Sequence, residues 1–122
     1  MRRTIILAAA VLALTACAGT TPPHLSDQMT DTDLKRLNGA QYYAFHGTLS
    51  NQSAWSNIKT GRGGTVRALR EFRDPETGLS CRKLVEHVRS VDGGNDYRIG
   101  TACKQPDGDL RVTYSDRVQV ED

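Results

Sequence analysis

The sequence is poor in the residues from which catalytic and metal sites are usually built. It has 122 residues with three Cys, three His and one Trp. His24, His46 and His87 are isolated from one another, so they lack the spacing of metal ligands. No nucleophile elbow occurs, and the glycine-rich residues 61–65 lack the ending of a phosphate-binding loop. We therefore expect no catalytic residue, no metal site and no cofactor.

The sequence also lacks an apolar run long enough to span a bilayer. Residues 5–14 form a run of about ten residues, which is the length of a secretory signal core. Arg2 and Arg3 precede this run, and Leu14-Thr15-Ala16-Cys17 ends it. This segment resembles a bacterial lipoprotein signal peptide with its lipobox. The resemblance implies that residues 1–16 are removed, that Cys17 is lipidated, and that residues 17–29 form a lipidated tether. The alternative is a plain secretory signal in which Cys17 is incidental.

A net charge is lacking as well once the signal is removed. The full chain has 16 Lys and Arg against 14 Asp and Glu, and the signal contains Arg2, Arg3 and no acid. The remaining chain is therefore neutral overall, which does not indicate a nucleic-acid-binding protein. Several acyl chains would attach it stably to a membrane. Ala18 follows the lipobox where Asp favours inner-membrane retention, so the resemblance implies the outer membrane.

A helix is predicted over residues 30–47 and short strands over residues 51–120. Thr30 is a suitable N-cap, Asp33 suits the first turn, and Gly47 is a suitable stop. We expect Leu34, Leu37, Gln41, Ala44 and Phe45 to share one face and the aromatic residues Tyr42, Tyr43 and Phe45 to pack. The predicted fold is mainly β (α+β): an N-terminal helix packed on a small antiparallel meander of about four to five strands with one disulfide.

Two segments of the β region are harder to assign. Trp55 is expected in a polar loop, and residues 59–64 are expected to form a turn. The apolar spacing of residues 80–91 fits a helix, whereas the flanking turns and valines favour a strand. Residues 92–95 then form a hairpin turn, followed by two alternating strands.

Cys81 and Cys103 are placed symmetrically about this turn. Their midpoint is residue 92, so the two cysteines should face each other across the hairpin. An exported chain meets an oxidising compartment, in which such a pair closes. We predict a Cys81–Cys103 disulfide worth about 3 kcal/mol at most, because the hairpin already holds the two strands together. The alternative is two buried free thiols.

Four stretches resemble the rickettsial seventeen-kilodalton surface antigen family of small outer-membrane lipoproteins. They are Trp55-Ser56-Asn57, residues 60–66, and residues 97–108 (YRIGTACKQPDG) together with Cys81-Arg82. The resemblance implies an envelope location and a similar fold for about half of the chain, and it carries over no catalytic residue. The glycine-zipper segment typical of the family is absent from this sequence, which leaves the lipid as the membrane contact.

A cluster of arginines is the remaining candidate site for an anion or a partner. If these residues share a face, they would contact lipid phosphates, lipopolysaccharide or another anionic glycan such as that of peptidoglycan. The alternative is a solvated sheet face whose cations pair with Glu71, Glu76, Glu86 and Asp96. The candidate patch consists of Arg62, Arg67, Arg70, Arg73, Arg82 and Arg98.

Three functions remain open at this stage. The favoured one is a lipid-anchored envelope lipoprotein of the outer membrane with a structural or interaction role and no catalysis. The second is a periplasmic binding or inhibitor module that acts on an envelope protein. The third is a hydrolase, for which the sequence offers no paired catalytic residues. The oligomeric state is left undetermined by the sequence.

Overall fold

The helix begins where its capping residues predict. The computed structural model describes residues 25–117, in which a short 3-10 helix, η1 (Leu25–Gln28), precedes α1 (Asp31–His46). The Thr30 hydroxyl accepts from the Asp33 N–H at 3.2 Å, and the Asp33 carboxylate accepts from the Thr30 N–H at 3.0 Å. This reciprocal capping box satisfies two N–H groups at the start of the helix. The predicted helix and its stop at Gly47 are confirmed.

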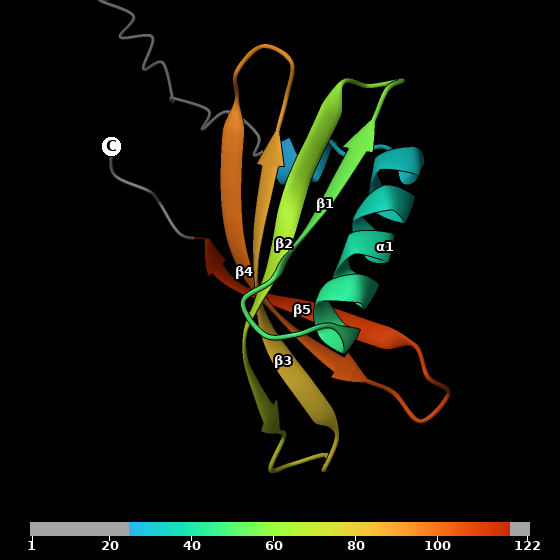
Figure 1. The fold of residues 1–122 in the computed structure, drawn as a ribbon, viewed down its shortest axis with the longest axis vertical. Helices are drawn as coiled ribbons and strands as arrows, with labels where there is room; N and C mark the ends of the chain where they lie inside the picture. The colour runs from blue at the N-terminus through green and yellow to red at the C-terminus, as the bar shows by residue number, and fades with distance from the viewer. Residues whose placement is uncertain (1–24, 118–122) are drawn as a thin grey trace, which may run out of the picture.

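Five antiparallel strands follow in a simple meander (Figure 1). They are β1 (Gln52–Asn57), β2 (Arg62–Arg73), β3 (Ser80–Arg89), β4 (Asn95–Lys104) and β5 (Leu110–Arg117). The sheet order is the order in the chain, from β1 at one edge to β5 at the other. The predicted fold class is confirmed, and the segment after residue 80 is a strand rather than a helix.

Helix α1 covers one face of the sheet and creates the core there (Figure 1). Leu37 of the helix and Val66, Leu84 and Val88 of the sheet are at most 1% exposed. Burial of each such side chain contributes about 1.5–3 kcal/mol. Trp55 joins this core from β1. Within residues 25–117 no helix or strand covers the opposite face of the sheet, called here the outer face.

Four local predictions are wrong. Trp55 lies in β1 rather than in a loop, because this short edge strand alternates polar side chains with buried ones. Gly63 and Gly64 belong to β2 rather than to a turn. Tyr42 and Tyr43 are 53% and 71% exposed rather than packed, since they lie on the solvent side of α1. Of the expected apolar face of α1, Leu34 is also exposed, and the other members are buried.

The predicted disulfide is confirmed. Cys81 lies directly opposite Cys103 in the β3–β4 pair, with their Cα atoms 4.1 Å apart, and their sulfurs are bonded. The register follows from the hairpin turn, as the symmetry of the two positions predicts.

The predicted signal peptide and Cys17 lie outside the described residues, as do residues 17–24 of the tether and residues 118–120 of the β region. No helix within residues 25–117 is both long and apolar enough to cross a membrane.

Candidate functional site: a cationic groove beside the edge strand

The buried carboxylate of Asp33 joins the start of α1 to the turn between β1 and β2. Its oxygens accept from Asn57 at 2.8 Å, Thr60 at 2.6 Å and Arg62 at 3.1 Å. Burial alone would raise the pKa of Asp33, but the hydrogen bonds from Thr60, Thr30 and Asn57 outweigh it and lower that pKa to about 2. The ionised side chain therefore holds the helix and the β1–β2 turn together.

We expect the contribution of Asp33 to stability to disappear in acid. Because the folded-state pKa of Asp33 is depressed, its stabilisation is complete above about pH 4 and is lost as the pH falls toward 2. Asp33→Asn should lower the free energy of unfolding by about 2 to 3 kcal/mol at pH 6. Denaturant unfolding of both proteins from pH 6 to pH 2 measures this difference, which should narrow as the pH falls.

The matched control is Asp31→Asn, which changes an exposed carboxylate in the same helical turn. It should leave stability within about 0.5 kcal/mol of the parent at each pH. A difference between Asp33→Asn and the parent that stays constant down to pH 2 would contradict the ionic role of Asp33.

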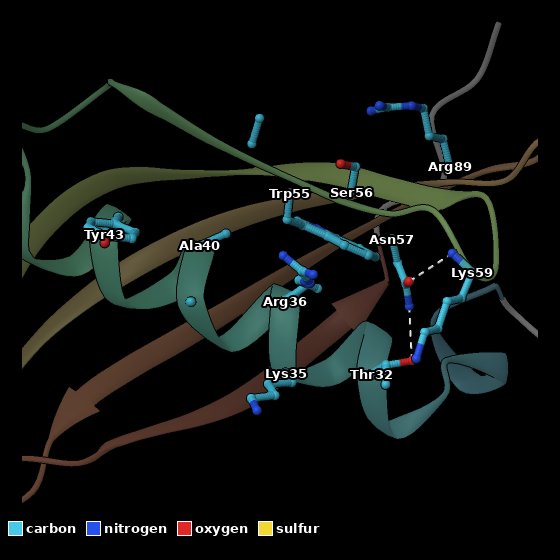
Figure 2. Close-up of a pocket in the computed structure, with 12 residues that line it drawn as sticks. Thr32, Lys35, Arg36, Ala40, Tyr43, Trp55, Ser56, Asn57, Lys59 and Arg89 are labelled. Atoms are coloured by element: carbon cyan, nitrogen blue, oxygen red, sulfur yellow. Dashed lines mark hydrogen bonds between the residues drawn. The ribbon is translucent and has the colours of Figure 1, made fainter.

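A groove of about 760 Å³ lies between α1 and β1 (Figure 2). Asn57, which donates to Asp33, is one of its lining residues. The helix contributes small residues at Gly39 and Ala40, and a Cβ added at Gly39 would meet nothing within 4 Å. Trp55 and Asn57 line the groove from the buried side of β1, whereas Ala54 and Ser56 line it from the outer side. The other lining residues are Thr32, Lys35, Arg36, Tyr43, Lys59 and Arg89.

The charged residues that line this groove are all cations. Lys35 and Arg36 come from α1, Lys59 from the β1–β2 turn and Arg89 from the end of β3. Among residues 25–117, none of these four side chains forms an ion pair or a side-chain hydrogen bond. Four unneutralised cations around one groove create a positive potential that attracts anions.

A second polar cluster lies under the other side of α1 and serves the fold. Glu86 is fully buried and accepts from Arg98 at 3.0 Å, from Gln41 at 2.7 Å and from the Tyr114 hydroxyl at 3.1 Å. Burial and the charge of Glu86 raise the pKa of Tyr114, which keeps its hydroxyl protonated as a donor. Arg98 also stacks 3.8 Å from the centre of the Tyr114 ring. A smaller groove of about 580 Å³ runs beside this cluster.

The structure does not bring the six predicted patch arginines together. Arg62 binds Asp33, and Arg98 binds Glu86. Arg82 donates to the carbonyls of Ala44 and Gly47, at 3.0 and 2.6 Å, and so satisfies the end of α1.

The other three arginines of the predicted patch lie elsewhere. Arg67 and Arg70 are exposed on the outer face, and Arg73 donates to the carbonyl of Gly78 in the β2–β3 turn. The alternative of acid-paired cations therefore holds for Arg98 with Glu86 and for Arg82 with Glu71, whose atoms lie 3.7 Å apart. It also holds for Arg62, although the acid beside Arg62 is Asp33. The patch as predicted is not a single surface.

The described residues contain one group with metal-ligand types in reach of one another, and its chemistry does not suit a metal. It consists of Asp74, Cys81 and Cys103. Because the two sulfurs are bonded to each other, they are not the thiolates that bind a metal.

Lys35 and Arg36 were not predicted as site residues. Their positions relative to Gly39 carried a usable signal, since residues three and four apart lie on one helix face. A lysine and an arginine one turn before a glycine predict a cationic helix face on which one side chain is missing. Their meeting with Arg89 is a long-range contact that the local pattern does not contain.

The protein is thus a small domain in which one helix packs on an antiparallel meander, with a cationic groove beside the edge strand β1.

This chain is similar in sequence to two curated proteins, each called 17 kDa surface antigen, one from Rickettsia bellii and one from Rickettsia bellii strain RML369-C. Each is 33% identical over 85 residues, which cover 69% of this chain and 52% of the relative. The chain thus spans about half the length of the curated relatives it matches. No family model matches the chain, and no solved structure matches it.

Proposed function

We propose that this protein is a lipid-anchored, surface-antigen-like protein of the cell envelope, attached to the outer membrane through Cys17, with a structural or interaction role. The main support for the lipid anchor is the sequence of residues 1–17, in which a basic start and an apolar run precede Leu14-Thr15-Ala16-Cys17. The similarity to the two surface antigens supports an envelope location. The proposal assigns the chain no catalytic step.

Cys17→Ser should release the protein from membranes, because the lipid is the attachment that the proposal provides. The measurement is the distribution of the full-length protein between the membrane pellet and the supernatant of lysed cells, together with the intact mass. The parent should pellet and carry acyl groups, whereas the variant should be soluble at the unacylated mass. Two or more acyl chains give stable attachment, so the expected change is nearly complete.

Ala18→Ser is the matched control, since it changes the next residue and keeps the thiol. It should pellet like the parent. Pelleting of Cys17→Ser together with an unacylated mass for the parent would contradict the anchor.

The groove favours a second candidate function, a binding module that acts on another envelope protein. Its four cations have no partner among the described residues, unlike Arg62, Arg82 and Arg98, which stabilise the fold. A lipid-anchored interaction protein needs such a surface, so the two candidate functions are compatible.

A further inference from the structure

The groove follows the free edge of the sheet. β1 is the first strand in the sheet order and pairs with β2 alone among the described elements. Trp55 and Asn57 border the groove on the helix side of β1, and Ala54 and Ser56 border it on the outer side. A groove that borders both faces of an edge strand has the shape required by an extended chain that adds to the sheet.

Glycines make room on both sides of this edge. Gly39 leaves the helix side open, since no atom lies within 4 Å of an added Cβ. On the outer face, Ser56, Gly63 and Arg89 are neighbours across β1, β2 and β3. The Arg89 guanidinium lies 3.1 Å from the position of a Cβ at Gly63, so this side chain extends across β2 toward the edge.

The cations therefore lie on both sides of β1. Figure 2 shows Lys35 and Arg36 on the helix side and Arg89 on the side of Ser56, with Lys59 near the end of the strand. The side chains of an added strand would point alternately to the two sides. An acidic side chain at any position of the added strand would then face a cation on one of the two sides.

We propose that this groove binds an extended polypeptide segment rich in Asp and Glu, which adds to β1 as a further strand. The main-chain hydrogen bonds of β1 supply affinity, and the four cations select acidic side chains. A second copy of this chain is a poor occupant, because two β1 edges side by side would bring the same cations together. The inference rests on the proposed interaction role and names the class of partner.

The test uses the full chain, purified in a non-ionic detergent, and a fluorescein-labelled peptide of alternating Thr and Glu. Fluorescence anisotropy should show binding to this peptide and at least tenfold weaker binding to a peptide of alternating Thr and Gln. Lys35→Gln with Arg36→Gln should weaken binding of the acidic peptide about fivefold, the effect of losing two exposed ion pairs. Arg67→Gln with Arg111→Gln removes the same charge from exposed positions outside the groove and should leave affinity unchanged.

Gly39 allows a steric test that keeps the fold intact. Gly39→Leu places a large side chain in the groove and should abolish binding, whereas Gly39→Ala adds one methyl group in open space and should retain it. Both changes improve helix propensity, so loss of folding does not explain a difference between them. Hydrogen exchange at Ala54 to Asn57 should slow when the acidic peptide is bound.

The proposal fails if the Thr-Gln peptide binds as tightly as the Thr-Glu peptide. It also fails if Arg67→Gln with Arg111→Gln weakens binding as much as Lys35→Gln with Arg36→Gln. Unchanged hydrogen exchange in β1 would refute strand addition. Binding of phosphatidylglycerol vesicles with the same groove dependence, in the absence of peptide binding, would identify a membrane surface instead. Cys17→Ser should bind the peptide normally, so a failure of the anchor and a failure of the groove are distinguishable.

Discussion

Gly64→Ala is expected to destabilise the domain strongly. A Cβ at this position would lie 1.8 Å from the carbonyl oxygen of His87 and 3.1 Å from Nε1 of Trp55. Gly64 is buried in β2, paired with Trp55 on one side and with Val88 on the other, so the contact involves backbone that cannot yield without separating the strands. We expect a cost above about 3 kcal/mol, which is a large part of the stability of a small domain.

Thermal unfolding of the purified variant measures this effect. A loss of about 3 kcal/mol corresponds to a fall in Tm on the order of 15 °C for a domain of this size. The control is Gly39→Ala, which occupies open space in the middle of α1 and should raise stability by about 0.5–1 kcal/mol. A Gly64→Ala protein that melts like the parent would show that β2 and β3 separate more easily than the structure implies.

Arg98→Met is expected to destabilise the protein by about 3–5 kcal/mol, because it leaves the charge of Glu86 buried without its cation. Glu86 is 0% exposed, and its Oε1 lies 3.0 Å from Nε of Arg98. Gln41 and Tyr114 would still donate hydrogen bonds, but these neutral donors do not balance a full charge. The free energy of unfolding from denaturant titration measures the loss.

The double variant Glu86→Leu with Arg98→Met separates the charge from the packing. Replacing both partners with apolar side chains removes the unpaired ion, so the double variant should be more stable than Arg98→Met alone. The double-mutant cycle should therefore show coupling between the two positions of at least about 1 kcal/mol. Additive effects would mean that Arg98 acts through its stacking on Tyr114 rather than through Glu86.

Local chemistry was sufficient to predict several elements. The Thr30 cap, the carboxylates of the first turn and the stop at Gly47 depend on neighbours within a few residues, and α1 has those bounds. The Cys81–Cys103 pair was predictable because a hairpin turn places positions on either side of it opposite each other.

It was harder to predict which face of the sheet each side chain occupies. One extra residue in a β-bulge reverses the alternation of all the side chains that follow it. The register of β2 against β3 shifts between Ala68 and Arg70. Without this shift Arg67 and Arg70 would lie on opposite faces, yet both lie on the outer face. The same shift separates Arg73 from Arg67, because their partners Ser80 and Val85 lie on opposite faces of β3. The sequence does not mark this bulge.

The sequence by itself determined the elements whose causes are local: the capped helix, the turns, the meander and the cysteine pairing. Only the tertiary structure decided which cations serve the fold and which remain available. Arg62, Arg82 and Arg98 pair with the carboxylates of Asp33, Glu71 and Glu86. Lys35, Arg36, Lys59 and Arg89 instead converge on the groove without partners among the described residues. The physical reason is that a side chain's charge is local, whereas its neutralisation depends on which surfaces the packing of α1 against the sheet brings together.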